Sequence, residues 1–342
     1  MSALDTGFAQ DSLKVPALAI SGSADVYYKY DWGHSKANNL TSFTNSHNSF
    51  ELGMATLKFD YKTTKVEMVA DLGFGKRAQE FSYNDDGVLA AVKQLYVSYT
   101  PASWIKFTAG SWATHVGYEL VDAPANRNYS MSYMFTNGPF FHTGVKAELS
   151  YKTSGFMIGL ANPTDFKYVP DGVINKKFLL AQYSFAPSDA FKAYLNYVGG
   201  ENIDTSKARQ VDLVLVTKPT AKLGVGFNGT YSSIKQYMGN KIYDENRSWW
   251  GSAVYLTYDP SEHVGFALRE EYFSDKDGLK VPALVLNGNI FSSTLSANLR
   301  VDNFLLIPEV RLDHANKSIF MKKDGSATAT SANVLIAAIF SF

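Results

Sequence analysis

Hydrophobic and polar residues alternate along the chain with a period of two, in repeats of about ten residues, the length that a tilted strand needs to cross a bilayer. Residues 190–198 are typical. Apolar or aromatic residues occupy one face of this segment, namely Phe191, Ala193, Leu195 and Tyr197, and the opposite face carries Lys192, Tyr194 and Asn196. Successive side chains of a strand point to opposite faces, so one face suits lipid and the other water. Helical periodicity is nowhere sustained. The pattern predicts an all-β protein.

Short and long connections follow one another regularly between these segments. The short ones cover residues 61–64, 100–103, 152–155, 186–189, 217–220, 259–262 and 302–303. The long polar ones cover residues 31–47, 76–88, 114–138, 162–175, 200–208, 234–246, 274–289 and 315–331. Outer-membrane barrels have short periplasmic turns, long extracellular loops and an even number of strands. We therefore expect a transmembrane antiparallel up-and-down β-barrel of about sixteen strands with both termini periplasmic. A soluble β-sandwich would share the alternation but not this asymmetry of loop lengths.

The chain shows no domain break, because proline and glycine are dispersed at turns. We expect a periplasmic N-terminal extension over residues 1–17 and a single transmembrane barrel domain over residues 18–342. Residues Met1–Gln10 lack a basic segment followed by an apolar one, so we expect a mature form without a signal peptide. The longest apolar run, Val334–Phe340, is far shorter than the roughly 20 residues of a spanning helix.

Composition narrows the function classes. Lysine and arginine total 32, as do aspartate and glutamate, so no net positive field favours nucleic acid as a partner. The chain has no cysteine, which leaves neither disulfides nor cysteine metal sites to stabilise it. Its 21 tyrosines and 23 phenylalanines fit strands that carry aromatic belts at two membrane interfaces.

The C-terminal segment, Asn333–Phe342, alternates and ends on an aromatic residue, Phe342. It resembles the terminal strand by which outer-membrane barrels are recognised for insertion. We therefore expect outer-membrane lipid and the barrel-assembly machinery to be partners of this chain. A homo-oligomer or another outer-membrane partner is a further possibility that the sequence leaves open.

The longest loop, residues 114–138, is the candidate constriction. A barrel of about sixteen strands is wide enough for an aqueous channel, and the third long loop of general porins folds inward. Its candidate constriction residues are Glu119, Asp122, Asn126, Arg127, Asn128 and Tyr129. An acidic pair facing an arginine across an aperture would create a transverse field that filters solutes by charge. An ordinary solvated loop is the alternative.

The strand faces assigned to the lumen carry nearly balanced charge. The basic members are Lys29, Lys58, Lys106, Lys146, Lys192, Lys222, Arg269, Arg300 and Arg311. The acidic members are Asp25, Glu67, Asp71, Glu148, Asp212, Glu271, Glu309 and Asp313. We expect weak charge selectivity and passive diffusion of small polar solutes or ions, because a specific anion channel should have a basic lining. For each single residue, a salt bridge within the wall is the competing interpretation.

Short motifs add a family resemblance. The segments Gly117-Tyr118-Glu119 and Asn128-Tyr129-Ser130, together with 308–313 (Pro-Glu-Val-Arg-Leu-Asp), resemble the OmpL-like family of β-barrel porins. The resemblance extends over most of the chain, including the strand 22–30. It implies a bacterial outer-membrane location and a channel-like role, without an established substrate.

Two other functions are alternatives to a channel. An enzyme similar to outer-membrane phospholipase A would need serine, histidine and a polar orienting group together on the lipid face, whereas the alternation turns His142 toward the lumen. The remaining histidines show no metal-ligand spacing, so we expect no enzyme activity, cofactor or metal. The second alternative is a binding or assembly scaffold with a plugged lumen, whose exposed loop aromatics would contact a partner: Trp32, Phe43, Tyr237 and Tyr243.

Overall fold

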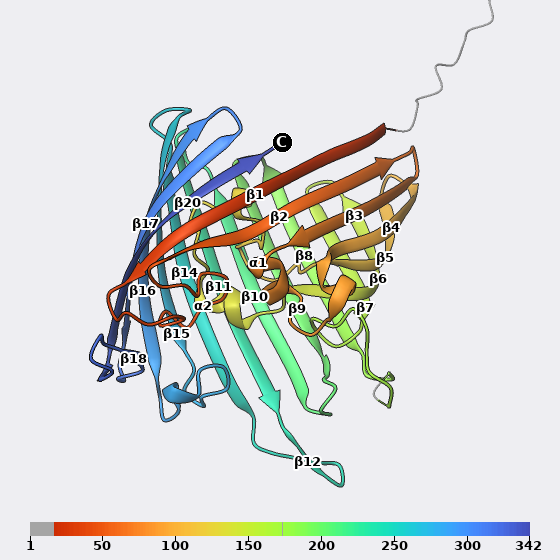
Figure 1. Cartoon of the computed structure of the whole chain (residues 1–342). Helices are drawn as coiled ribbons and strands as arrows, with labels where there is room; N and C mark the ends of the chain where they lie inside the picture. Colours follow the sequence, from red (N-terminus) through yellow and green to blue (C-terminus); the bar gives the residue numbers. More distant parts are fainter. Residues whose placement is uncertain (1–16, 173) are drawn as a thin grey trace, which may run out of the picture.

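The computed structural model describes residues 17–172 and 174–342, and it is a closed antiparallel β-barrel (Figure 1). Each strand pairs with its neighbour in sequence, apart from two small hairpins, and β20 closes the barrel on β1. The wall strands are β1 (Ala17–Asp31), β2 (Ser49–Lys62), β3 (Val66–Phe74), β4 (Val92–Ala102), β5 (Ile105–Ala113), β6 (Phe141–Tyr151), β7 (Ser154–Ala161), β8 (Phe178–Ser188), β9 (Phe191–Glu201), β10 (Lys207–Thr217), β11 (Leu223–Lys235), β14 (Arg247–Tyr258), β15 (Val264–Ser274), β16 (Asn289–Val301), β17 (Phe304–Ala315) and β20 (Thr330–Ser341). The predicted all-β barrel of about sixteen strands is confirmed.

The two ends of the barrel differ in the length of their connections. Seven short turns and the C-terminus lie at one end, here called the turn side (Figure 1). Eight long connections lie at the other end, the loop side: L1 (32–48), L2 (75–91), L3 (114–140), L4 (162–177), L5 (202–206), L6 (236–246), L7 (275–288) and L8 (316–329). The hairpin of β12 (Tyr237–Gly239) and β13 (Ile242–Tyr243) extends L6, and that of β18 (Phe320–Met321) and β19 (Ala327–Thr328) extends L8.

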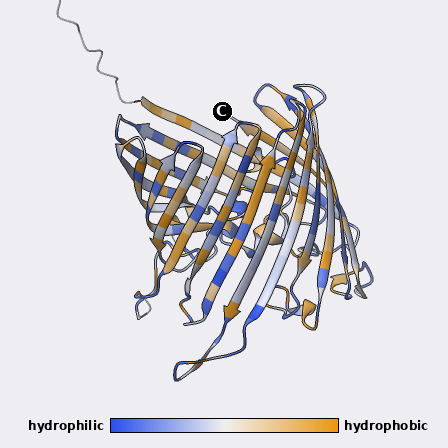
Figure 2. Cartoon of the chain, turned by 180° about the vertical axis from the view of Figure 1, so that it is seen from behind, coloured by the Kyte–Doolittle hydropathy of each residue, from blue (hydrophilic) through white to orange (hydrophobic). Residues whose placement is uncertain are grey.

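The alternation in the sequence becomes the inner and outer faces of the wall. In β4, Leu95, Val97 and Tyr99 are about half exposed on the outside, whereas Ser98 is buried on the inside. In β20, Ile336 and Phe340 are exposed, whereas Ile339 is buried. Hydrophobic and hydrophilic residues accordingly alternate along the strands in Figure 2. A sandwich would bury the apolar face of each strand against a second sheet, whereas here that face is exposed, so the closed barrel excludes a sandwich.

Two boundaries differ from the sequence-based expectation. The turn expected at 100–103 lies at 103–104, because β4 continues to Ala102. Its pairing with β5 shifts between Tyr99 and Ala102, around Pro101, which has no N–H to donate to a ladder. The expected extension, residues 1–17, lies outside the described residues apart from Ala17, where β1 begins.

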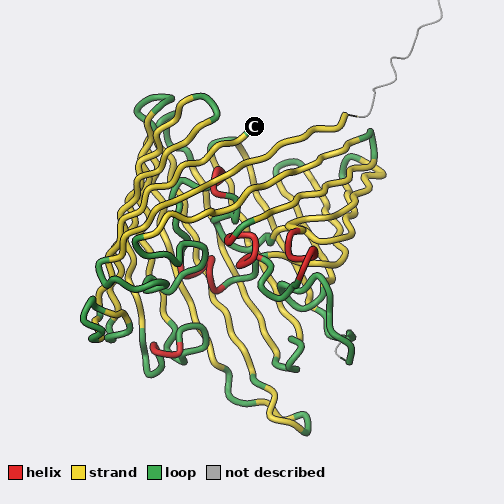
Figure 3. Tube along the Cα trace, viewed as in Figure 1, coloured by secondary structure: helices red, strands yellow, loops and turns green. Residues whose placement is uncertain are grey.

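Helices in the described ranges are short, and none is long and apolar enough to cross a membrane. They are α1 (Lys76–Phe81) in L2, α2 (Tyr133–Asn137) in L3, and the 3-10 helices Gly87–Ala91, Ala123–Ala125 and Pro282–Leu284. Figure 3 shows most of these segments at mid-height within the outline of the barrel. These short helices are part of the loop segments that narrow the interior of the barrel.

One loop aromatic is not exposed as expected. Phe43 in L1 is 1% exposed and packs against Phe135 and Phe140, so the expectation that it contacts a partner is wrong. It instead joins an apolar cluster to which L3 contributes Val121, Met131, Phe135 and Phe140. Trp32, by contrast, is 52% exposed.

Candidate functional site

L3 crosses the barrel interior and is held against one side of the wall by carboxylates. Glu271 of β15 accepts the backbone N–H groups of Tyr133 and Met134, each at 2.8 Å, at the start of α2. Glu309 of β17 accepts those of Tyr129 and Ser130, at 2.7 and 3.1 Å. The first N–H groups of a helix have no partner within the helix, and negative charge is favourable there. Two wall glutamates therefore fix the course of L3.

Buried arginines hold the same side of L3. Arg269 Nη1 lies 2.6 Å from Glu119 Oε1 and donates to the carbonyl of Ser130 at 2.6 Å. Arg311 Nε lies 2.9 Å from Asp313 Oδ1, while its Nη1 donates to the carbonyl of Met131 at 2.7 Å. Arg269 and Arg311 are fully buried. Such pairs lose their water shells, so removing one partner leaves a costly unpaired charge.

The remaining expected constriction residues also bond to the wall or within L3. Arg127 pairs with Asp259 at 2.6 Å, and Asp122 pairs with Lys93 at 2.5 Å. Further hydrogen bonds complete the set: Asn128 donates to Ser296 at 2.7 Å, the Tyr129 hydroxyl donates to Asp25, and Asn126 bonds within L3 to Leu120 and Asp122. An acidic pair facing an arginine across an aperture is therefore not formed, because wall groups are nearer partners. That these residues line a constriction stays a prediction.

The other expected lumen residues lie mostly toward the turn side. Lys106 pairs with Glu67 at 2.8 Å, Lys146 with Glu148 at 3.4 Å, and Arg300 with Asp259 at 3.1 Å. Lys192 is exposed near the start of β9. Lys222 lies in the turn before β11, where its Nζ donates to the carbonyl of Pro260 at 3.0 Å.

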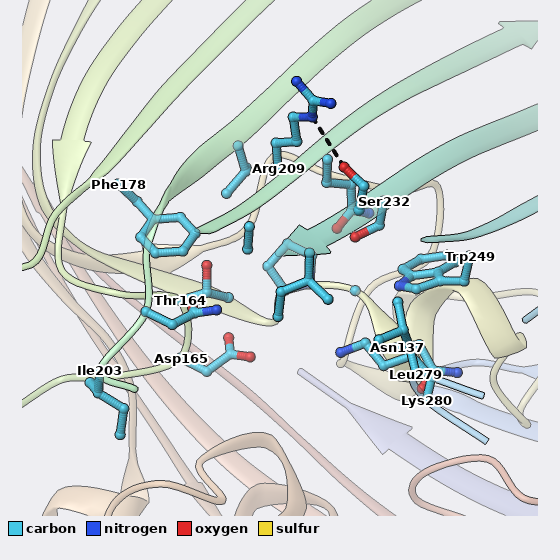
Figure 4. Close-up of a pocket in the computed structure, with 18 of the residues that line it drawn as sticks. Asn137, Thr164, Asp165, Phe178, Ile203, Arg209, Ser232, Trp249, Leu279 and Lys280 are labelled. Atoms are coloured by element: carbon cyan, nitrogen blue, oxygen red, sulfur yellow. Dashed lines mark hydrogen bonds between the residues drawn. The ribbon is translucent and has the colours of Figure 1, made fainter. Parts of the chain in front are cut away.

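On the opposite side, L3 leaves three cavities that follow one another along β10, β11 and β14. The vestibule, on the loop side, has a volume of about 490 Å³ and is enclosed by L2, L3, L4, L5 and L7 together with the wall (Figure 4). The neck has a volume of about 10 Å³, and the lower cavity about 50 Å³. The vestibule and neck share Gly138, Pro139 and Gln210, and the neck and lower cavity share Tyr118 and Glu119. About 10 Å³ is the space that one water needs, so the neck is the smallest of the three cavities.

An aromatic stack lies where the neck meets the lower cavity. The rings of Tyr118 and Tyr255 are 4.0 Å apart at an interplanar angle of 20°. Gly226 of β11 leaves room for Tyr118, because a Cβ at this glycine would lie 2.5 Å from a ring carbon. Any larger residue at position 226 would displace the tyrosine.

Asp212 is the acidic group of the neck that has no cationic partner among the described residues. Its carboxylate accepts the N–H of Gly117 at 3.0 Å and the side-chain amides of Asn196 at 2.8 Å and Asn228 at 2.6 Å. These neutral donors stabilise the carboxylate without cancelling its charge. Glu119, the other acid of the neck, is paired with Arg269.

Asp165 of L4 joins three loops at the vestibule. Its Oδ1 accepts the N–H groups of Phe140 and Phe141 at 2.7 and 3.0 Å, and its Oδ2 accepts the hydroxyl of Tyr83 at 3.0 Å. Burial raises the pKa of the Asp165 carboxyl from 3.8 to about 6, and these three hydrogen bonds only partly oppose the shift. Burial of the charged form is therefore unfavourable at neutral pH.

Replacing Asp165 with asparagine should stabilise the protein at pH 7.5, by up to about 3 kcal/mol, because two pKa units correspond to that free energy. Asparagine keeps an acceptor for Phe140 and Phe141 without a buried charge. Because the folded pKa is raised, wild-type stability should rise as the pH falls through about 6 toward 4, and the advantage of D165N should shrink over that window. Urea unfolding of lipid-reconstituted protein at pH 7.5 and 5 measures the difference in the free energy of unfolding between D165N and wild type. In D165A, the two N–H groups lose their acceptor, so this control should be destabilised; a D165N variant that weakens at pH 7.5 would contradict the assignment.

The sequence predicted only some of the residues that line the neck. Alternation placed Asp212 on the lumen face, as the structure does. It gave no reason to single out Tyr118, Met134 or Tyr255, because contacts between L3 and β14 depend on the course of a loop without periodicity. Gly226 within β11 was a local signal of a close approach, one that Gly224 and Gly229 of the same strand share.

Comparison with known proteins agrees with this architecture. The family model described as "Putative beta-barrel porin-2, OmpL-like" matches residues 17–342. No curated protein matches the chain.

Solved porin structures share the fold at low sequence identity. The anion-selective porin from Comamonas acidovorans has a TM-score of 0.63 at 9% identity, over 96% of this chain and 100% of that one. The outer-membrane channel DcaP of Acinetobacter baumannii has a TM-score of 0.62 at 11% identity, over 96% and 97%. OmpT of Vibrio cholerae has a TM-score of 0.59 at 9% identity, over 96% and 98%. The family match covers almost the whole described barrel, and the chain therefore belongs to the OmpL-like β-barrel porins and is a channel protein of the bacterial outer membrane.

Proposed function

We propose that small polar solutes and ions diffuse passively through this porin along the vestibule, the neck and the lower cavity. The observation that carries the proposal is the sharing of lining residues between successive cavities. L3 supplies one wall of the neck, through residues 116–119, 132, 134–135 and 138–139, and β10 and β11 supply the other. In this proposal the long loops are extracellular, the termini are periplasmic, and the protein is not an enzyme.

The proposed charge selectivity is weak and favours cations. Most charges of L3 are paired with the wall, so they add little net field to the path. Asp212 remains as an uncompensated carboxylate in the neck. Charged side chains affect ion selectivity most strongly at the narrowest part of a pore.

A planar bilayer tests both statements. Purified wild-type protein should give stepwise ohmic conductance, and its reversal potential in a KCl gradient should show a small excess of K⁺ over Cl⁻ permeability. Asp212→Asn should move that ratio toward unity. Asp302→Asn, a charge change in a turn far from the neck, is the matched control. Persistent absence of steps would exclude an open channel, and an unchanged ratio in D212N would exclude the role of Asp212.

A plugged scaffold is the second candidate, because the neck has a volume close to that of one water. In that case L3 closes the lumen permanently, and exposed residues such as Trp32 contact another protein. The same bilayer recording separates the two, since a scaffold gives no conductance.

We also propose self-association and assembly contacts in the membrane. One OmpT structure similar to this chain, at 10% identity and a TM-score of 0.61, is described as a trimer form. The outer wall between β4 and β8 has an apolar hollow of about 680 Å³, lined by residues such as Val97, Val145 and Leu160, against which lipid or a second copy can pack. The last strand, ending at Phe342, is the proposed contact with the barrel-assembly machinery.

A further inference from the structure

The vestibule has the size of a ligand site. Its volume of about 490 Å³ lies within the range of roughly 300–1,000 Å³ typical of small-molecule pockets. Phe178, Trp249 and Leu279 give it apolar surfaces, and Thr164, Asn137 and Ser232 give it polar ones (Figure 4). Arg209 lines the cavity, but its Nε donates to Ser233 at 3.1 Å and Figure 4 shows its guanidinium pointing away. The remaining charged groups thus decide what the cavity prefers.

The carboxylates around the vestibule already have their hydrogen bonds within the protein. Asp165 accepts three donors from L2, L3 and β6. Asp275 accepts the N–H groups of Leu279, Lys280 and Val281 at 2.9, 2.7 and 2.7 Å. Asp204 accepts the N–H and hydroxyl of Ser206 at 2.9 and 2.6 Å. These acids therefore offer little to a bound cation.

Two donors that line the vestibule have no acceptor in the part of the chain that the structure describes. One is Nζ of Lys280 in L7, an exposed residue that forms no ion pair although the charges of Asp165 and Asp275 act on it. The other is the indole Nε1 of Trp249 in β14, which Figure 4 shows on the side of the ring toward the cavity. An ammonium group and an indole N–H can only donate, so only water or a ligand that carries an acceptor can pair with them in the cavity.

We propose that the vestibule binds small organic anions, in which a carboxylate accepts hydrogen bonds from Lys280 and Trp249 and an aromatic or aliphatic body lies against Phe178 and Leu279. The proposal goes beyond the channel function above: the site lies at the loop-side end of the proposed path, and binding there does not require the anion to enter the neck, where Asp212 favours cations. Charge-assisted hydrogen bonds to the ammonium group provide the preference for an anion. The apolar walls provide the preference for a solute with a hydrophobic body.

Isothermal titration calorimetry of the purified barrel in detergent, with sodium benzoate as the probe, tests this site. Wild-type protein should bind benzoate saturably. Benzyl alcohol, which lacks the carboxylate, and acetate, which lacks the ring, should each bind at least about tenfold more weakly. Lys280→Gln should weaken benzoate binding by about tenfold or more, and Trp249→Phe, which keeps a ring but removes the N–H, by a smaller factor. Lys276→Gln, the same charge change in L7 outside the vestibule lining, should bind like wild type.

Equal binding of benzoate to wild type and K280Q, or equal binding of benzoate and benzyl alcohol, would overturn the proposal. Circular dichroism and heat-modified gel mobility establish that each variant is folded, and K276Q controls for the loss of charge from L7. Calorimetry does not require conduction, so the two proposals fail separately. Benzoate binding to a barrel without conductance would overturn only the channel path, whereas conductance without Lys280-dependent binding would overturn only the site.

Discussion

Replacing Tyr118 with alanine is expected to raise single-channel conductance by roughly two- to fivefold, because the ring lines the neck, and aromatic or apolar constrictions limit flow. Tyr118 separates the neck, of about 10 Å³, from the lower cavity and stacks on Tyr255 at 4.0 Å. Truncation at Cβ removes one face of that stack and joins the two spaces. The measurement is conductance per step in planar bilayers, together with the rate at which sugars of increasing size enter liposomes.

Three variants make this expectation specific. Tyr118→Phe keeps the ring and should conduct like wild type. Tyr231→Ala removes a tyrosine from the outer face of the neighbouring strand β11, where it is 44% exposed, and should also leave conductance unchanged. Gly226→Ala should alter conductance by pushing the Tyr118 ring, which a Cβ would approach to 2.5 Å. Equal conductance of Y118A and wild type would show that solutes take another route.

Replacing Arg269 with methionine is expected to destabilise the protein by about 3–5 kcal/mol, because breaking a buried ion pair leaves an uncompensated charge. Glu119 would lose its partner at 2.6 Å, and the carbonyl of Ser130 would lose its donor. Both groups lie in L3, so open-channel noise should increase as the loop loosens. Urea unfolding in lipid vesicles measures the first effect, and bilayer recordings measure the second.

Arg300→Met is the matched control. Arg300 also pairs with an acid, Asp259 at 3.1 Å, but about 30% of its side chain is exposed, so its loss should cost less than about 1 kcal/mol. Comparable destabilisation by R269M and R300M would contradict the view that L3 depends on its buried pairs. Replacing both Arg269 and Glu119 with apolar residues should recover part of the loss, since no unpaired charge would remain.

The membrane-spanning wall follows from local physical rules, and sequence reasoning predicted it well. Period-two alternation fixes which face of each strand meets lipid, and a shift of one residue would turn every apolar side chain inward. Short turns and long loops then fix the antiparallel order of neighbouring strands. Arg269, Glu271, Glu309, Arg311 and Asp313 were accordingly placed on the inner face, where the structure also has them.

The partners of those inner side chains could not be predicted in the same way. Glu119 and Arg269 are 150 residues apart, and Tyr129 and Glu309 are 180 apart. No local periodicity relates such positions, so an acidic pair facing an arginine within L3 was a reasonable expectation that the structure replaces with bonds from L3 to the wall. Phe43 was misplaced for the same reason, because its burial depends on Phe135 and Phe140 far along the chain.

By itself, the sequence determined the class of this protein, the number of its strands and the two faces of its wall, because each of these depends on side chains a few residues apart. Only the tertiary structure decided which side of the wall L3 follows, and with it the position of the neck beside β10 and β11. That choice depends on hydrogen bonds from wall carboxylates to the backbone N–H groups of L3, such as those of Glu271 and Glu309. Every residue except proline has such a backbone N–H group, so no residue pattern in L3 could predict which glutamates would bind these groups.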